Sequence, residues 1–228
     1  MIQFVNVTKI YNELKALDNV TFEVKSGEMV FIVGPSGAGK STLMRLLYRE
    51  EKPTSGQVFV SKVDVSRLPN NQIPILRRKM GIVFQDFKLL ANKTSFENVA
   101  YSLFAIGMDH LEIQKRVHSA LKVVGLTNKS NDFPKNLSGG EQQRIGIARA
   151  IVQGPSLLLA DEPTGNLDPL TSMEIFQLLE RINQRGTTVI VATHNQNMVD
   201  QMKKRVIALN SGRVLSDIVS GTYVTHAS

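Results

Sequence analysis

The sequence contains no cysteine, and none of its apolar runs is long. The lack of cysteine excludes disulfide bonds and cysteine-based zinc sites, and it fits the reducing conditions of a cytosol. No run approaches the roughly 18 apolar residues that a membrane-spanning helix needs. Charged residues interrupt residues 1–25, so no signal peptide is expected. These absences predict a cytoplasmic protein that is soluble by itself.

The chain is basic, with a net charge of +7 and a pI near 9.7. Its cations form short groups at residues 77–79, 115–116 and 203–205, and no run of Lys or Arg reaches five. No aromatic residues interleave with these groups, as a base-stacking platform would require. We therefore expect no nucleic-acid partner. A peripheral place on an anionic membrane is favoured, since each basic residue there gains about 1 kcal/mol.

Residues 34–41 read Gly-Pro-Ser-Gly-Ala-Gly-Lys-Ser and match the phosphate-binding loop pattern G-x-x-x-x-G-K-[ST] at every fixed position. An apolar strand is predicted before the loop over residues 28–33, and a helix after it over residues 41–48. A chance glycine turn is the alternative, which the Lys-Ser pair and both flanking elements disfavour. The predicted ATP-binding residues here are Gly34, Pro35, Ser36, Gly37, Ala38, Gly39, Lys40, Ser41 and Thr42.

Each part of this loop has a physical role in holding phosphate. Its glycines let the backbone bend without Cβ clashes, so that successive N–H groups can point at anionic oxygens. The positive end of the following helix adds to the attraction. Lys40 would reach the β- and γ-phosphates of ATP, and the Ser41 hydroxyl would bind Mg²⁺.

Two strands are predicted upstream, over residues 2–10 and 16–25, where apolar and polar residues alternate. We expect them to pair antiparallel and to cover one side of the nucleotide site. Tyr11 falls at the turn between them, and its ring could stack on the purine of ATP. An ordinary aromatic residue at the sheet interface is the alternative, but the phosphate loop downstream favours stacking.

Residues 81–85 are predicted to form a strand that ends in a polar residue, Gln85. An amide oxygen at the end of a central strand can be offered to a metal or a water. The alternative is a solvated strand end. Gln85 is therefore a candidate Mg²⁺ ligand and catalytic residue.

From residue 86 to about residue 136 the pattern becomes helical, with helices predicted over residues 95–106 and 111–124. We interpret this stretch as a helical insert in an α/β domain. Phe87, Leu89 and Leu90 are expected to be exposed and to offer a groove to the amphipathic helix of a partner. The alternative is that these side chains belong to the core.

A second anion-ready helix start is predicted at residues 137–141, which read Leu-Ser-Gly-Gly-Glu. Ser138 suits the N-cap, and Gly139 and Gly140 allow close approach of a ligand to the backbone. An ordinary capped helix is the alternative. The two glycines disfavour it, because glycine destabilises a helix at these positions.

Residues 156–162 form an apolar run that ends in two carboxylates, Asp161 and Glu162. This form is typical of a central parallel strand that delivers acids at its carboxyl edge. Asp161 would hold Mg²⁺ through water, and Glu162 would act as general base on the attacking water. A strand followed by a solvated turn is the alternative.

A further strand is predicted over residues 187–193, with His194 directly after it. Since the predicted acids and amide fall on the same sheet edge, His194 could contact the γ-phosphate. A lone histidine is more often structural. Downstream, residues 206–209 and 213–215 are expected to form a hairpin, followed by a tail at residues 216–228.

Taken together, the loop at residues 34–41, Gln85, residues 137–141, residues 157–162, residues 166–168 and His194 resemble the ATP-binding cassette (ABC) ATPase family, in the family's order. The resemblance implies a P-loop α/β fold with an antiparallel β subdomain and a helical insert. It implies one domain over residues 1–228, with a catalytic core in residues 1–85 and 137–215 and a helical subdomain in about 86–136.

The resemblance also implies a mechanism and partners. Two copies would form a head-to-tail dimer in which Ser138, Gly139, Gly140 and Asp168 of one copy meet ATP bound by the other. The cassette would hydrolyse ATP and serve a separate integral membrane subunit from the cytoplasmic face of the membrane. Within the family the chain looks like the branch that acts in bacterial cell division and controls cell-wall hydrolysis. The alternatives are a lipoprotein-releasing or macrolide-export ATPase, and a soluble ABC protein acting on nucleic acid.

Overall fold

The computed structural model describes residues 1–220, which form two compact units. The first unit comprises residues 1–77 and 183–220, and the second comprises residues 78–182. The second unit contains the predicted helical insert of residues 86–136 together with strands and helices on both sides of it in the chain. The division into a catalytic core and a helical subdomain remains a prediction. Among the described residues, no helix combines the length and apolarity needed to cross a bilayer.

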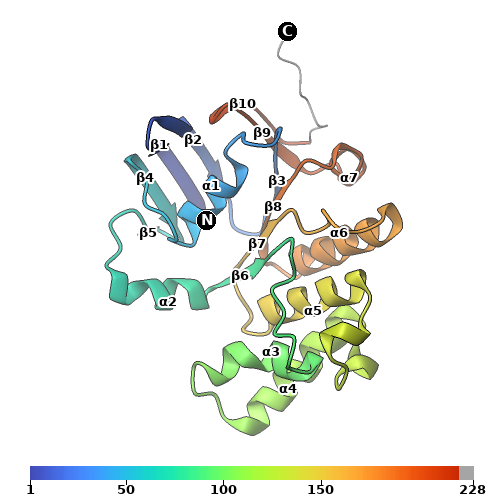
Figure 1. Cartoon of the computed structure of the whole chain (residues 1–228). Coiled ribbons are helices and arrows are strands. Elements are labelled where there is room, and N and C mark those ends of the chain that lie inside the picture. The colour runs from blue at the N-terminus through green and yellow to red at the C-terminus, as the bar shows by residue number, and fades with distance from the viewer. Residues whose placement is uncertain (221–228) are drawn as a thin grey trace. The chain divides into compact units, whose positions relative to one another are not determined.

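The first unit contains an antiparallel sheet in the order β2-β1-β4-β5 (Figure 1). Its strands are β1 (Ile2–Tyr11), β2 (Leu14–Val24), β4 (Ser55–Val60) and β5 (Val63–Asp64). The alternation in the sequence places one side of β1 and β2 in the core, where the rings of Phe4 and Phe22 stack with centroids 4.7 Å apart. The two predicted antiparallel strands are therefore confirmed.

The same unit contains a second group of strands in the order β10-β9-β3-β8. These strands are β3 (Met29–Val33), β8 (Thr188–Thr193), β9 (Arg205–Asn210) and β10 (Arg213–Ile218). β3 pairs in parallel with both β8 and β9, and every residue of β3 and β8 is buried. Continuous apolar runs of this kind are typical of parallel strands covered on both faces. The helices of this unit are α1 (Lys40–Leu47), α2 (Ile73–Arg78, at the unit boundary) and α7 (Gln196–Met202).

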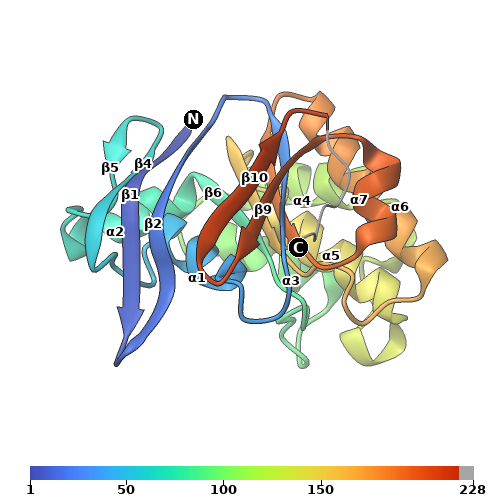
Figure 2. The ribbon, with the colours of Figure 1, turned by 90° about the horizontal axis from the view of Figure 1, so that it is seen from above.

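The hairpin β9–β10, seen from above in Figure 2, is longer than predicted. The sequence predicted a strand ending at residue 215, but β10 continues to Ile218 and pairs residue by residue with the start of β9. An ion pair explains the extension, because Asp217 receives two 2.8 Å hydrogen bonds from the Arg205 guanidinium. The predicted tail at residues 216–228 is therefore wrong for residues 216–218, and residues 221–228 lie outside the described part of the chain.

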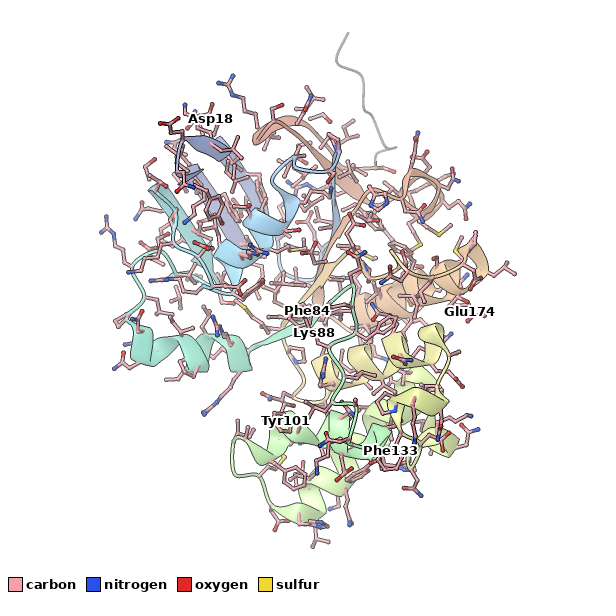
Figure 3. The ribbon with its side chains drawn as sticks, in the orientation of Figure 1. Asp18, Phe84, Lys88, Tyr101, Phe133 and Glu174 are labelled. Atoms are coloured by element: carbon pink, nitrogen blue, oxygen red, sulfur yellow. The ribbon has the colours of Figure 1, made fainter. Side chains whose placement is uncertain are left out.

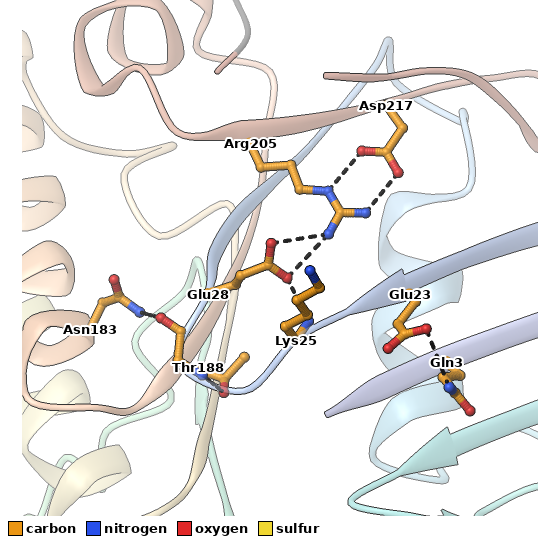
Figure 4. Close-up of polar contacts among 9 residues, drawn as sticks. Gln3, Glu23, Lys25, Glu28, Asn183, Thr188, Arg205 and Asp217 are labelled. Atoms are coloured by element: carbon orange, nitrogen blue, oxygen red, sulfur yellow. Dashed lines mark hydrogen bonds and ion pairs between the residues drawn. The ribbon is translucent and has the colours of Figure 1, made fainter. Parts of the chain in front are cut away.

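A polar network fastens the start of β3 to its neighbours (Figure 4). Arg205 also donates to both carboxylate oxygens of Glu28, at 3.1 and 3.2 Å. The hydrogen bonds that Arg205 donates to Asp217, followed by the charges of Asp217 and Glu28, raise the pKa of Arg205 above its ordinary value. Beside it, the backbone of Gly27 donates to the Thr188 hydroxyl and accepts from the Asn183 amide. The strand that leads into the phosphate loop is thus held at its entry by side chains from β8, β9 and β10.

The second unit combines one parallel strand pair with four α-helices (Figure 1). Its elements are β6 (Met80–Val83), β7 (Leu157–Asp161), α3 (Ser95–Phe104), α4 (His110–Val124), α5 (Gly139–Ile151) and α6 (Pro169–Gln184, which crosses the boundary). α5 packs against β6, α3 and α4, and it buries apolar residues such as Ile145 and Ile147. Both helices predicted in residues 86–136 are confirmed.

Candidate functional site

The predicted site residues are distributed over both units. The first unit carries Tyr11, the phosphate loop and His194, and the second carries Gln85, Ser138–Gly140, Asp161, Glu162 and Asp168. Each group is positioned by its own strands and helices.

The phosphate loop runs from the end of β3 to the start of α1, as the sequence predicts. Gly39 precedes the first helical residue with φ 104°, and no side chain caps the helix. A Cβ atom at Gly39 would lie 2.5 Å from the Ala16 carbonyl oxygen, and one at Gly34 would lie 2.2 Å from the Leu209 carbonyl oxygen. These contacts exclude any side chain at either position, because real Cβ atoms do not approach so closely. The glycines are therefore required by the packing of the loop as well as by its conformation.

The loop is supported from the C-terminal hairpin. The Gly212 N–H donates to the Ala38 carbonyl at 3.2 Å, and the Gly212 carbonyl accepts from the Asp18 N–H at 2.8 Å. Gly212 has φ 76°, and a Cβ there would lie 2.8 Å from the Ala16 carbonyl oxygen. The turn between β9 and β10 thus fits between the phosphate loop and β2.

Lys40 is 7% exposed and lies under its own loop. Its ammonium donates to the carbonyl oxygens of Gly34 at 2.9 Å and Pro35 at 3.1 Å. This geometry brings the charge to the loop that is predicted to hold phosphate. Ser41 follows at the first turn of α1 and is exposed, whereas Thr42 is half-buried.

Tyr11 is the last residue of β1 and pairs with Leu14, so its predicted place in the turn is wrong, because the strand continues one residue beyond residue 10. The Lys9 ammonium lies 4.7 Å from the centroid of its ring and is itself held by Glu51 at 2.7 Å and the Lys52 carbonyl at 2.9 Å. This cation occupies one face of the ring, so a purine could stack only on the opposite face. The Tyr11 hydroxyl is buried without a hydrogen-bond partner among the described residues. Sequence reasoning missed Lys9, although its place two residues before Tyr11 on the same strand face was a usable signal.

His194 directly follows β8 and is exposed. The next residue, Asn195, caps α7 by accepting a hydrogen bond from the Met198 N–H. The position at a parallel strand's carboxyl end agrees with the sequence prediction. Its contact with phosphate remains a prediction.

Gln85 lies in a turn, and the predicted strand over residues 81–85 is wrong at its end because β6 stops at Val83. The strand ends there because the Phe84 carbonyl accepts from the Gln143 side chain, at 3.3 Å. The Gln85 carbonyl accepts from the Asn166 amide at 3.4 Å. Its side chain packs so closely on Gly165 that a Cβ there would lie 2.8 Å from the Gln85 amide nitrogen.

The expectation that Phe87, Leu89 and Leu90 are exposed is also wrong, because all three are half-buried. The reason lies in Asn98, a fully buried residue of α3. Its side chain accepts from the Leu90 N–H at 2.8 Å and donates to the Leu90 carbonyl at 3.1 Å. This pairing draws the segment against α3.

The two predicted acids follow each other at the end of β7. Asp161 is the last strand residue, and Glu162 comes next with a φ of 46°, a left-handed conformation uncommon for glutamate. The Glu162 carbonyl accepts from the Gly165 N–H at 3.1 Å, which closes a turn directly after the acids. Strained backbone of this kind persists where the surrounding structure holds it, often at functional sites.

Ser138 caps α5, as predicted, through a reciprocal capping box with Glu141. The Glu141 N–H donates to the Ser138 hydroxyl at 3.3 Å, and the Ser138 N–H donates to the Glu141 carboxylate at 2.8 Å. This last bond is the main reason that the pKa of Glu141 is lower than its ordinary value. The charged carboxylate also lies at the positive end of the helix, where it is stabilised.

The structure brings Ser138, Gly139 and Gly140 together with Asp168, which the sequence could only group by family resemblance. These residues line one open hollow of about 300 Å³. Asp168 accepts from the Thr171 N–H at 3.0 Å, and its bonds to Thr171 lower the pKa of the carboxyl group. A Cβ at Gly140 would lie 2.5 Å from the Thr171 side chain, so a glycine is needed where α5 passes the start of α6.

A phosphate loop after a parallel strand and a capped Ser-Gly-Gly helix define a P-loop nucleotide-binding α/β protein. Comparison with known proteins gives the family. The family model described as "ABC transporter" matches residues 17–165. The chain belongs to the ABC ATPase family.

Relatives match over nearly the full chain. The cell division ATP-binding protein FtsE of Bacillus subtilis is 52% identical over 224 residues, which cover 98% of each chain. FtsE of Mycobacterium tuberculosis is 52% identical over 225 residues and 98% of each chain. Among solved structures, the dimeric ATP-binding cassette MJ0796 in a post-hydrolysis state with ADP and Pi is 38% identical, with a TM-score of 0.87, and matches 98% of this chain and 100% of that one.

Proposed function

We propose that this chain is the ATP-binding and ATP-hydrolysing subunit of a bacterial cell-division complex, an FtsEX-like assembly with a membrane protein. The observation that carries the proposal is the full-length similarity to FtsE, at 52% identity. The phosphate loop supports it, because Gly34 and Gly39 pack where no side chain would fit. The solved relative with bound ADP and Pi supports hydrolysis as the reaction.

In this proposal each site residue has a role in the cleavage of ATP. Lys40 and the loop N–H groups bind the phosphates, and Tyr11 stacks on the adenine. Glu162 accepts a proton from the attacking water, which receives the γ-phosphoryl group, and His194 contacts that γ-phosphate. Mg²⁺ fits the donors on offer, since the Ser41 hydroxyl, the Gln85 amide and the Asp161 carboxylate all provide the oxygen ligands that it prefers. The bound ion would neutralise the charge that develops on the phosphate oxygens.

ATP would also join two copies of the chain. The hollow lined by Ser138, Gly139, Gly140 and Asp168 belongs to one copy and would close on ATP held by the phosphate loop of the other. Because such a ligand binds the dimer better than the monomer, mass action makes ATP the driving force of dimerisation. The dimeric state of the solved relative supports this arrangement.

The membrane partner would be an integral, FtsX-like subunit, which holds this chain on the cytoplasmic face of the membrane. The half-burial of Leu89 and Leu90 makes them poor docking residues. The second unit instead exposes Tyr101 and Phe104 on α3, at 57% and 51%. They are three residues apart and share one face of the helix, which suits contact with an amphipathic helix of the partner.

The roles of Glu162 and Lys40 can be tested by substitution. Glu162→Gln should retain ATP binding and lose roughly 10²–10⁴-fold in turnover, because a positioned general base contributes that much. Lys40→Ala should weaken ATP binding itself. Glu23→Gln makes the same charge change on an exposed strand position and should behave like the wild type. Nucleotide affinity, steady-state hydrolysis and sedimentation with Mg-ATP are measured on all three variants.

The Glu162→Gln variant should also sediment as a dimer with Mg-ATP, since it cannot hydrolyse the ligand that joins the copies. Turnover equal to that of the wild type would remove Glu162 from the role of base. A monomer at saturating ATP would contradict the sandwich dimer.

A further inference from the structure

α5 presents three residues, Gln143, Gly146 and Arg149, to the segment that carries Gln85. Their spacing of three puts them along one side of the helix. The segment begins at Phe84 and ends at Lys88, which Figure 3 labels. At Gly146 the helix passes close to the segment, since a Cβ there would lie 3.6 Å from the Phe87 carbonyl oxygen, an ordinary contact distance. The helix that begins at the Ser-Gly-Gly sequence is thus also the support of the Gln85 segment.

Gln143 is fully buried, and its side-chain nitrogen bridges two backbone carbonyls. It donates to Pro163 at 2.6 Å and to Phe84 at 3.3 Å. Its own oxygen is buried and has no partner among the described residues. An unpaired buried oxygen is unfavourable, and it offsets part of what the two hydrogen bonds contribute to stability. What the residue provides is a link between two chain segments.

The two carbonyls lie next to the residues proposed to act on ATP. Phe84 directly precedes Gln85, and Pro163 directly follows Glu162. The two segments also touch each other, because the Gln85 side chain packs on Gly165. The Gln143 side-chain amide therefore sets the distance between the segment that carries Gln85, the proposed metal ligand, and the turn that carries Glu162, the proposed base.

Arg149 holds the far end of the same segment. Its guanidinium donates to the carbonyl oxygens of Phe87 at 2.8 Å and Lys88 at 2.6 Å. Both residues have left-handed backbone, with φ of 57° and 51°. Such conformations persist only where contacts hold them. Burial lowers the pKa of the Arg149 guanidinium, which shows that the cation gives up water to make these bonds.

We infer that Gln143 and Arg149 are positioning residues for ATP hydrolysis, which fix the Gln85 segment and the Glu162 turn to the helix that starts at Ser138. The inference rests on the proposed roles of Gln85 and Glu162 and adds two residues that the sequence did not single out. The signal in the sequence is weak: Gln143 is the polar residue on the buried side of α5, whose other buried residues are apolar or glycine.

The test for Gln143 separates turnover from binding. Gln143→Met keeps the size of the side chain and removes both hydrogen bonds. In the full chain with Mg-ATP, we expect kcat to fall at least tenfold while KM stays within threefold, since the phosphate loop is untouched. Gln153→Met is the matched control: Gln153 also donates to a backbone carbonyl, that of Ser102 at 3.2 Å, away from these segments. It should keep the wild-type kcat.

A folded Gln143→Met protein, verified by its thermal melt, with kcat within twofold of the wild type would overturn the inference for this residue. Glu162→Gln is assayed in parallel. If that variant still hydrolyses ATP, the proposed function of Glu162 fails. If it is inactive and Gln143→Met is active, only the positioning inference fails.

Arg149 provides a second test that does not depend on the folding of the Gln143 variant. Arg149→Met removes both hydrogen bonds, and Arg149→Lys retains a cation that can reach one carbonyl. We expect kcat to fall at least fivefold in Arg149→Met and to recover in part in Arg149→Lys, with KM little changed in both. Equal kcat values for the wild type and a folded Arg149→Met would overturn this part of the inference.

Discussion

The phosphate loop allows a sharp test of packing, because two of its glycines have similar backbone and different surroundings. Gly37 has φ 79° and would meet no atom within 4 Å if it carried a Cβ. Gly39 has φ 104°, and its Cβ would lie 2.5 Å from the Ala16 carbonyl oxygen and 2.8 Å from the Leu17 side chain. Replacing each by alanine separates the backbone effect from the steric effect.

The expected sizes follow from these two contributions. An alanine in a left-handed conformation costs about 1–2 kcal/mol. Overpacking against neighbours that cannot move adds about 1–3 kcal/mol. Gly37→Ala should therefore lower the free energy of unfolding by about 1–2 kcal/mol, and Gly39→Ala by about 2–5 kcal/mol. The Ala16 backbone is part of β2 and cannot rotate away as a flexible side chain would.

Urea unfolding of both variants and the wild type at 25 °C, without nucleotide, gives the comparison. The difference in midpoint, at unchanged slope, reports the difference in stability. If both variants have the same midpoint, the close approach of the loop to β2 is refuted. A loss of stability that is the same in both variants would still be explained by the left-handed backbone at the two positions.

Three further predictions follow from the ion pairs of Arg205, the capping box of Ser138 and Glu141, and the exposed side chains of Tyr101 and Phe104. Arg205→Met should lower the free energy of unfolding by about 2 kcal/mol, since it removes charged hydrogen bonds that solvent only partly screens, and 1 M salt should reduce this difference in denaturant titrations. Glu141→Ala should cost about 1 kcal/mol at pH 7 through loss of the capping box. Because folding lowers the pKa of Glu141, this contribution is complete above the unfolded value near 4.5 and is lost as pH falls through the folded value, so melts at pH 3 and 7 should show the variant difference shrinking in acid. Changing Tyr101 and Phe104 together to Asp should abolish co-fractionation with membranes and leave ATP affinity intact, whereas Ile75→Asp, at an exposed site in the first unit, should do neither; a double variant that still fractionates with membranes would place docking elsewhere.

The parts of the fold that the sequence predicts well are those in which local pattern and tertiary packing agree. The apolar run of β3, the glycine-lysine loop and the Ser138 cap each carry their own signal, and each lies where it was expected. Their physical causes act over a few neighbouring residues, through strand periodicity, loop conformation and capping.

The errors arise where a distant side chain decides the outcome. β6 stops early because Gln143 takes the Phe84 carbonyl, and Leu90 is half-buried because Asn98 holds its backbone. β10 runs on to Ile218 because Arg205 pairs with Asp217. Gln143 and Arg205 are far in sequence from the residues that they fix, and only Asn98 is near its partner. A prediction from local sequence pattern therefore could not include these contacts.

The contact between Gly212 and the phosphate loop has a consequence for the time at which the protein becomes active during synthesis. Ala38 leaves the ribosome early, but the N–H that pairs with its carbonyl belongs to a turn near the other end of the chain. Leu209, whose carbonyl packs on Gly34, also comes late. A nascent chain that ends before β9 therefore contains the whole phosphate loop without the β9–β10 hairpin that supports it. Nucleotide-binding competence should appear late in translation, which limits ATP capture by unfinished chains.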